Sequence, residues 1–216
     1  FIITDEDYVP TIGITAVEIL REEFGSGTDI PSGWETKSAL GTDPNVWLFN
    51  GLTLDTLGKA YVSLVGASEG ATYDSTADGN LLLVSKLINA KGLTNVTVAF
   101  DWKAGGETDQ VDSEVYFDYG QFVYSFDGTN FTSLDKFAGL ASGGAPQTGK
   151  YKQILNELDN RQFYIGWRWY NDSLLGTSFS FTVDNVVVSA TPASVATVLA
   201  QSDTERVRVG DQLYFI

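Results

Sequence analysis

The sequence predicts an all-β fold, a two-sheet antiparallel β-sandwich with a short strand-like arm at each end. Three observations predict it. Short β-rich segments recur at strand length, separated by clusters of Gly, Asp, Asn and Ser. Strands do not alternate with helices, as a parallel sheet would require. The Asp-Gly pair in "FDGTNF" (126–131) lies between two β-rich segments and predicts a hairpin turn.

The expected strands lie along the chain at 16–24, 45–50, 59–66, 80–88, 95–104, 113–128, 130–137, 161–170 and 178–190. The segment 150–159 has a weak helical pattern, for which a single turn is an equal alternative. Pro10 and Pro192 separate apolar, β-prone ends from the rest of the chain. We therefore expect an N-terminal arm over 1–13, a core domain over 14–190, and a linker with a C-terminal strand over 191–216.

The chain contains no Cys, no His and no Met. It therefore has no Ser-His-Asp triad, no cysteine nucleophile and no zinc site with nitrogen or sulfur ligands. Any metal must be bound by oxygen, which favours calcium over a transition metal.

The formal net charge is −15, from 28 acidic and 13 basic residues. Nucleic acids and anionic membrane surfaces attract Lys/Arg-rich faces, so this charge argues against both as partners. No apolar run approaches the ~18–20 residues that span a bilayer, so we expect no membrane insertion. The start "FIITDEDYVP" has no signal-peptide pattern. We expect that a signal peptide has been removed or that the chain is part of a longer protein.

The segment "RQFYIGWRWY" (161–170) concentrates aromatic residues. In a strand, Phe163, Ile165, Trp167 and Trp169 share one face, and this face is large and wholly apolar, which predicts core. The other face carries Tyr164, Arg168 and Tyr170. These three side chains are candidates for binding a sugar or a polar chain. Alternatively, they lie on an outer sheet face that binds no ligand.

Asp184 interrupts the apolar strand "TVDNVVV" (182–188), in which we expect it to share a face with Val186 and Val188. A carboxylate buried there without a partner is costly. One interpretation is a calcium ligand that bridges the last strand to the first, with Glu22 or Glu23 opposite and backbone carbonyls completing the shell. The other is a paired or edge-exposed aspartate.

Other carboxylates allow weaker hypotheses. The loop 104–114 carries several acidic residues without EF-hand spacing, which indicates a solvated loop or a second, weak cation site. Glu114 and Asp118 lie four residues apart and are expected to share a strand face, so they are the candidate acid pair of a glycosidase. The accompanying glycosidase pattern is absent, and we expect no enzyme activity.

The apolar ends "FIIT" (1–4) and "QLYFI" (212–216) favour pairing with a sheet edge. Each end pairs either with its own domain or with a neighbouring copy of the chain. The second alternative predicts a filament linked by exchange of terminal strands.

Four segments of the chain have a recognisable order: "EEFGSGTDIPSGWET" (22–36), "LLLVSKLINAKGLTNVTVAFDWKA" (81–104), "VYSFDGTNFTSL" (123–134) and "NRQFYIGWRWYNDSLLGTSFSFTVDNVVV" (160–188). Together they resemble the cleaved-adhesin or choice-of-anchor J modules found in surface proteins of Bacteroidota. These segments cover about 20–190 in the family's order. Gly25 departs from the pattern, because the opening strand often carries a second acidic residue there.

The resemblance implies a jelly-roll sandwich similar to MAM and galactose-binding-like domains, extracellular or at the cell surface, and usually non-catalytic. It also implies a structural calcium, with Asp184, Glu22 and Glu23 as candidate ligands. The implied function is adhesion or structural support, with a glycan, a surface protein or copies of the chain as partners. A filament subunit and a carbohydrate-binding module of a secreted glycan-degrading enzyme are the alternatives. Three Asp-Ser/Thr tripeptides resemble the O-glycosylation signal of Bacteroidota and would place Thr56, Ser75 and Ser173 on the surface.

Overall fold

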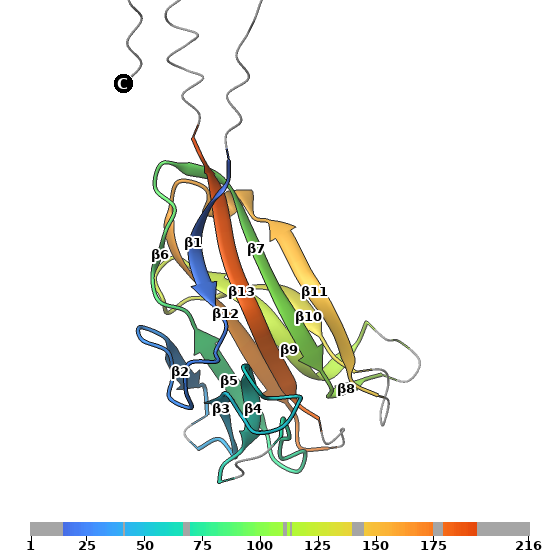
Figure 1. Ribbon diagram of the computed structural model, residues 1–216. Coiled ribbons are helices and arrows are strands. Elements are labelled where there is room, and N and C mark those ends of the chain that lie inside the picture. The colour runs from blue at the N-terminus through green and yellow to red at the C-terminus, as the bar shows by residue number, and fades with distance from the viewer. Residues whose placement is uncertain are drawn as a thin grey trace, which may run out of the picture.

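Two antiparallel sheets pack face to face as a β-sandwich (Figure 1). The computed structural model describes residues 15–40, 42–66, 70–109, 112, 114–139, 145–174 and 179–193. From β4 onward the chain repeatedly crosses from one sheet to the other, as in a jelly roll. The predicted fold class is confirmed.

Sheet A has the strand order β11-β7-β13-β4-β3, with β1 also paired to β13. Its strands are β1 (Val17–Glu22), β3 (Asn45–Phe49), β4 (Ala60–Leu64), β7 (Leu93–Ala104), β11 (Gln147–Ile154) and β13 (Phe181–Pro192). Sheet B has the order β10-β9-β12-β5-β2, with β6 beside β12 and β8 beside β9. Its strands are β2 (Glu35–Ser38), β5 (Gly79–Val84), β6 (Ile88–Asn89), β8 (Glu107–Thr108), β9 (Tyr116–Ser125), β10 (Thr132–Phe137) and β12 (Gln162–Asn171).

The core lies between the sheets and is rich in aromatic rings. Trp167 is fully buried; its ring stacks on Trp34 at 6.1 Å and meets Phe100 edge to face at 5.2 Å. Phe163, Ile165 and Trp169 are also fully buried. The predicted inward face of 161–170 is therefore confirmed. Alternation along one strand was sufficient to identify it.

Three strands were not expected from the sequence: the two-residue β8, which falls in the segment expected as a loop, and the polar strands β2 and β11. The four residues of β2 are all exposed, and Tyr151 is the one buried side chain of β11. Both strands lie at sheet edges, where apolar alternation is weak and polar side chains face solvent. The segment 150–159 contains the end of β11 and a single 3₁₀ turn, η1 (Asn156–Leu158), so the single-turn alternative is confirmed.

A β-bulge in β13 changes the expected faces of that strand. The register against β7 shifts between Asp184 and Val187, and Asn185 has φ of 51°. Val183 and Val186 are therefore both fully buried in the core. The prediction that Asp184 shares a face with Val186 and Val188 is wrong, because the extra residue turns Asp184 to the outer face of sheet A.

The first and last strands of the core meet at one end of the sandwich, where Val17 pairs with Ala190 (Figure 1). The arm 1–13 lies outside the described residues, as does the end of the chain from residue 194. Strand exchange through "FIIT" or "QLYFI" therefore stays a prediction. Within the described residues, no helix has the length and apolar character needed to cross a membrane.

Candidate functional site

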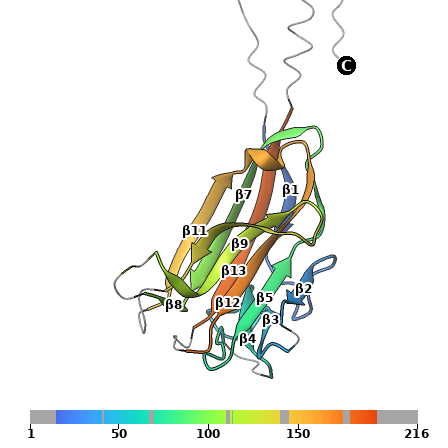
Figure 2. The ribbon, with the colours of Figure 1, turned by 180° about the vertical axis from the view of Figure 1, so that it is seen from behind.

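The outer face of sheet B carries a row of three tyrosines, Tyr116, Tyr119 and Tyr170, which we call the tyrosine row. Tyr170 on β12 is 38% exposed and lies opposite Tyr119 on β9. Their ring centroids are 5.5 Å apart, and the Tyr119 and Tyr116 centroids are 5.8 Å apart. Figure 2 shows β9 and β12 side by side on the near side of the sandwich.

Lys136 on the neighbouring strand β10 stabilises this row. Its Nζ lies 4.1 Å from the Tyr119 centroid and 5.2 Å from the Tyr116 centroid. An ammonium over the face of an aromatic ring is attracted by the ring's quadrupole. The lysine therefore fixes the two rings from the β10 side, while Tyr170 remains exposed.

Arg168 lies between the tyrosine row and the β9–β10 hairpin. It lines a small hollow of about 220 Å³ with Lys37, Asn80 and Leu82 on one side and the hairpin on the other. Its buried Nε has no hydrogen-bond partner among the described residues. The guanidinium therefore lies at a concave part of the face, although its Nε atom is buried.

Tyr164 is on the same outer face but is packed against protein. Its ring lies under Gly128 of the hairpin and joins a small apolar cluster with Leu82, Val84, Val123 and Phe131. Lys37 holds the hairpin by donating to the Gly128 carbonyl at 2.9 Å. Tyr164 thus supports the face and is a poor candidate for contact with a ligand.

The structure thus separates the three predicted ligand-binding residues. Tyr170 belongs to an aromatic row, Arg168 lines a hollow beside it, and Tyr164 is covered. The sequence interpretation missed Tyr119 and Tyr116. The alternation in 119–125 was the available signal for Tyr119, because Phe122 is buried and Tyr119 and Gln121 stand on the opposite face.

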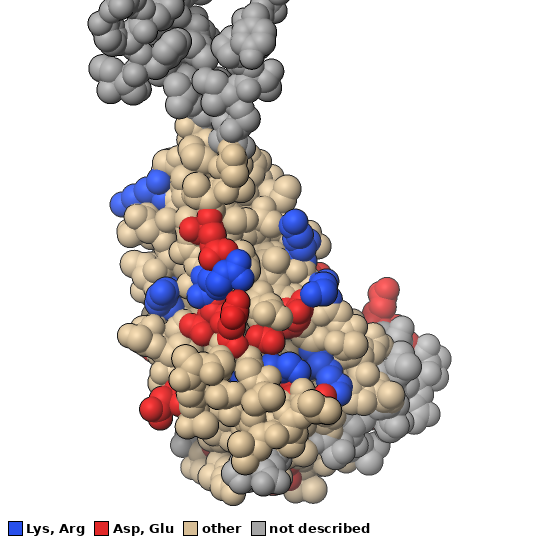
Figure 3. Space-filling model, viewed as in Figure 1, with Lys and Arg blue, Asp and Glu red and all other residues tan. Residues whose placement is uncertain are grey.

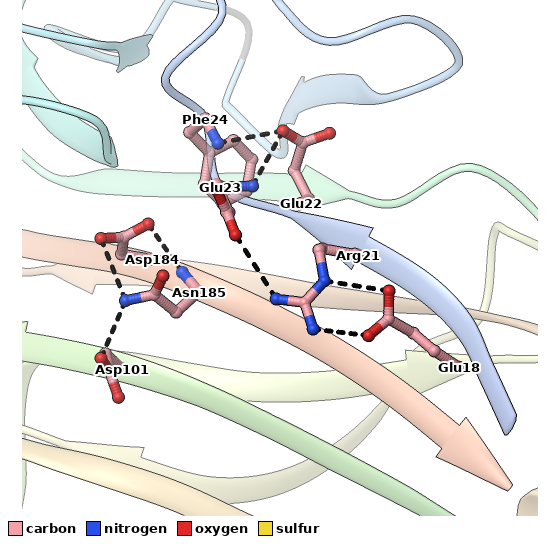
Figure 4. Close-up of polar contacts among 8 residues, drawn as sticks. All are labelled: Glu18, Arg21, Glu22, Glu23, Phe24, Asp101, Asp184 and Asn185. Carbon is pink, nitrogen blue, oxygen red and sulfur yellow. Dashed lines mark hydrogen bonds and ion pairs between the residues drawn. The ribbon is translucent and has the colours of Figure 1, made fainter. Parts of the chain in front are cut away.

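Acidic and basic side chains are interleaved on the face shown in Figure 3, and Figure 4 shows Asp184 beside Asn185. The Asp184 carboxylate accepts the Asn185 backbone N–H at 2.6 Å, and the Asn185 side chain also donates to Asp101 at 2.9 Å. Burial raises the pKa of Asp184; the negative charges of Asp101 and Glu23 add to this, while Lys59 opposes it. A half-buried carboxylate near other carboxylates is an environment that a divalent cation would relieve.

The predicted calcium ligands are only partly brought together. Glu23 lies close enough to act on Asp184 and is also 3.4 Å from Arg21. Glu22 instead accepts the backbone N–H groups of Glu23 and Phe24 at 3.1 and 3.0 Å, and Figure 4 shows it turned away from Asp184. No three acidic side chains in the described part of the chain are arranged to hold a metal ion. The oxygen donors of Asp184 and Glu23 suit calcium in kind, and backbone carbonyls and water would have to complete the shell.

The candidate acid pair of a glycosidase is not assembled. Asp118 is fully buried on β9, where it accepts hydrogen bonds from the Tyr73 hydroxyl at 2.5 Å and the Asp172 N–H at 2.9 Å. Burial raises its pKa to about 6. Glu114 is exposed and precedes the strand, so the expectation that it shares a strand face with Asp118 is wrong. The acidic loop is also only partly solvated, because Glu107 is buried.

The three candidate O-glycosylation residues differ in accessibility. Thr56 is fully buried and its hydroxyl lies 2.9 Å from that of Thr53, so its expected place on the surface is wrong. Ser75 is half-buried and Ser173 is exposed. Glycosylation at Ser75 and Ser173 stays a prediction.

No family model and no curated protein matches the sequence. Among solved structures, the K3 cleaved adhesin domain of Lys-gingipain from Porphyromonas gingivalis W83 aligns with a TM-score of 0.51. The alignment covers 80% of this chain and 98% of that domain at 18% identity. The fold is that of a cleaved adhesin domain.

Two further solved structures have lower scores. The K1 cleaved adhesin domain of the same gingipain aligns with a TM-score of 0.48 and 17% identity, over 81% of this chain and 97% of that one. A family 29 carbohydrate-binding module from Piromyces equi aligns with a TM-score of 0.42 and 13% identity, over 81% of this chain and 89% of the module. The cleaved-adhesin fold agrees with the resemblance carried by the segments 22–36, 81–104, 123–134 and 160–188.

Proposed function

We propose that the chain is a non-catalytic adhesion module that works outside the cell and binds a glycan through the outer face of sheet B. The tyrosine row is the observation that carries the proposal. A tyrosine offers both an apolar ring face and a hydroxyl, and a sugar ring has both apolar faces and hydroxyl groups. The Arg168 guanidinium lines the hollow beside the rings, and a guanidinium carries several N–H donors.

Charge supports a neutral ligand for this face. Lys136 is stacked on the tyrosine rings. Lys37 is engaged with the Gly128 carbonyl and with Glu35 at 3.3 Å. The net charge of −15 disfavours anionic polymers in general. A neutral glycan therefore fits better than a nucleic acid or an acidic polysaccharide.

Two observations support a binding role without catalysis. The acid pair that the sequence offered for glycosidic cleavage is not assembled, because one member is buried in a strand and the other is exposed outside it. The fold is shared with an adhesin domain of Lys-gingipain. That likeness also supports an extracellular or cell-surface location.

We further propose that a structural calcium joins β1 to the bulge of β13 through Glu23 and Asp184. The half-buried Asp184 carboxylate and its acidic neighbours support this proposal. The role of the ion would be to fix the first and last strands of the core, with no part in binding the glycan, because the two sites lie on opposite faces of the sandwich.

The proposal is tested with a printed array of neutral glycans followed by calorimetry on the best ligand. Tyr170→Ala and Tyr119→Ala should each weaken binding by about tenfold or more. The matched control is Phe126→Ala, because Phe126 is 42% exposed but lies outside the tyrosine row. An array without binding, or full affinity in Tyr170→Ala, would overturn the proposed function.

A further inference from the structure

The sandwich is open along one edge, between β10 of sheet B and β11 of sheet A. The opening is a cavity of about 550 Å³, which we call the edge slit. This volume lies within the range of about 300–1,000 Å³ that is usual for ligand pockets. Aromatic side chains form its walls: Trp102, Tyr116, Phe137 and Tyr151.

The hydroxyl of Tyr151 is the most informative group in the edge slit. Tyr151 is 7% exposed, and its ring stacks on Phe100 at 4.6 Å. The hydroxyl is buried and no hydrogen bond of good geometry to a described residue satisfies it; its polar neighbour is the Asp135 carboxylate, which also lines the slit. Burial, and then the charge and proximity of Asp135, raise the pKa of Tyr151, so the group stays a neutral hydroxyl. A buried hydroxyl without a well-formed hydrogen bond is costly, and a ligand that hydrogen-bonds to it would remove that cost.

The remaining polar groups of the edge slit indicate an uncharged ligand. Lys136 is stacked on the tyrosine row, and Lys150 forms an ion pair with Asp101 at 3.0 Å. Neither ammonium is therefore available to neutralise an anion, and the Asp135 carboxylate, which also lines the slit, would repel one. Gln147 and Gln153 line the slit with amides that both donate and accept hydrogen bonds. Amides, a buried hydroxyl and aromatic walls together suit a neutral molecule with several hydroxyl groups.

The edge slit is continuous with the tyrosine row. Tyr116 lines the slit and is also the last ring of the row, at 5.8 Å from Tyr119. Lys136 likewise belongs to both, since it lines the slit and covers the two rings. A ligand that lies along Tyr170 and Tyr119 is thus led to the mouth of the slit at Tyr116.

We propose that the edge slit is an end subsite for a neutral oligosaccharide, whose terminal sugar enters the slit while the preceding sugars lie on the tyrosine row. This inference rests on the proposed function and deepens it, because it makes the preferred ligand an oligosaccharide with a free end. Short saccharides occupy the row alone, and longer ones gain the contacts of the slit.

The experiment uses neutral β-1,4-linked gluco-, manno- and galacto-oligosaccharides of two to six residues, with calorimetry on the whole chain. Hexasaccharide of the preferred sugar should bind more tightly than disaccharide. Tyr151→Phe removes only the buried hydroxyl and should weaken hexasaccharide binding by about tenfold. Its melting temperature should change little, since the hydroxyl makes no hydrogen bond of good geometry with the described residues in the protein without ligand. The matched control, Tyr124→Phe, removes a hydroxyl from a half-buried tyrosine outside the slit and should leave affinity unchanged.

The outcomes separate the two proposals. Unchanged hexasaccharide affinity in Tyr151→Phe, with weakened binding in Tyr170→Ala, overturns the proposal that the edge slit is an end subsite and leaves the proposed function intact. Unchanged binding in Tyr170→Ala overturns the proposed function. Absence of binding to the whole series overturns both. A double variant, Gln147→Ala with Gln153→Ala, is an independent check, because both side chains are exposed and line the slit. It should also weaken hexasaccharide binding. Lys152→Ala, at an exposed residue outside the slit, should leave binding unchanged.

Discussion

The outer faces of the two sheets differ in chemistry although both sheets pack on one core. On sheet A, acidic and basic side chains are interleaved (Figure 3). They form ion pairs: Lys103 with Asp55 at 2.6 Å and Lys150 with Asp101 at 3.0 Å. On sheet B, Tyr119 and Tyr170 face outward without such pairing. A face whose charges pair with each other has few free groups for a ligand. Exposed aromatic rings have no such partners, so their faces remain available for contact with a ligand.

This difference indicates which outward-facing residues are the better candidates for contact with a ligand. Charged residues on a sheet face draw attention in a sequence, but here they are largely neutralised by their neighbours. Aromatic residues that alternate with buried ones are less conspicuous, because they resemble core.

Trp167 and Tyr170 test the two faces of β12. Trp167→Ala should lower the free energy of unfolding by about 3–5 kcal/mol, because it opens a cavity among buried rings. Tyr170→Ala should cost less than about 1 kcal/mol, since its ring is partly exposed. Urea unfolding measures both values. Equal losses would mean that Tyr170 is part of the fold's support and not of a free binding face.

Asp118 should make the fold more stable as the pH falls from 7 towards 4. Its pKa is about 6 in the folded protein, above the usual 3.8, because of burial. The folded state therefore holds a proton that the unfolded state has lost, and ionising Asp118 costs up to about 3 kcal/mol of stability above pH 6. Asp118→Asn should flatten the dependence of unfolding free energy on pH between 4 and 6.

Asp127 is a control for Asp118, because its pKa is shifted in the opposite direction. Hydrogen bonds from Asn130, Thr129 and Ser125 hold the pKa of Asp127 well below its usual value. Its contribution is present above pH 4 and is lost as the pH falls further. Asp127→Asn should therefore leave the interval from pH 4 to 6 unchanged. An interval as steep in Asp118→Asn as in the unchanged protein would contradict the role given to Asp118.

Calcium should raise the melting temperature by about 5–10 °C when the free ion is at about 100 times its Kd. Asp184→Asn should remove this rise, because it removes the central carboxylate of the proposed site. Asp78→Asn, at an exposed aspartate elsewhere, should retain it. Differential scanning calorimetry with calcium and with a chelator provides the measurement, and identical melting temperatures in both would refute the calcium proposal.

Lys150→Ala should have the smallest effect on stability, below about 0.5 kcal/mol. The lysine side chain is 83% exposed, so water and salt screen its ion pair with Asp101. Urea unfolding at low and high salt measures the change. A loss above 1 kcal/mol would show that the charge pairs of sheet A contribute to the fold more than exposed pairs usually do.

Much of the fold was predictable because it depends on local pattern. Period-2 alternation placed Trp167 and Trp169 in the core, and the Asp-Gly pair placed the hairpin at 126–131. The edge strands β2 and β11 were not predictable, since their side chains are mostly polar and their hydrogen bonds come from neighbouring strands. Thr56 was misplaced because a tripeptide carries no information about burial.

The sequence by itself determined the sandwich, its aromatic core and the absence of thiol and imidazole chemistry, because these depend on composition and on spacing within single strands. Only the tertiary structure decided the sites. Tyr116, Tyr119 and Tyr170 come from two strands, and the edge slit forms between two sheets. Asp184 faces outward because a bulge changes the register of β13. Such features arise from pairing between distant segments, and no pattern within one segment encodes that pairing.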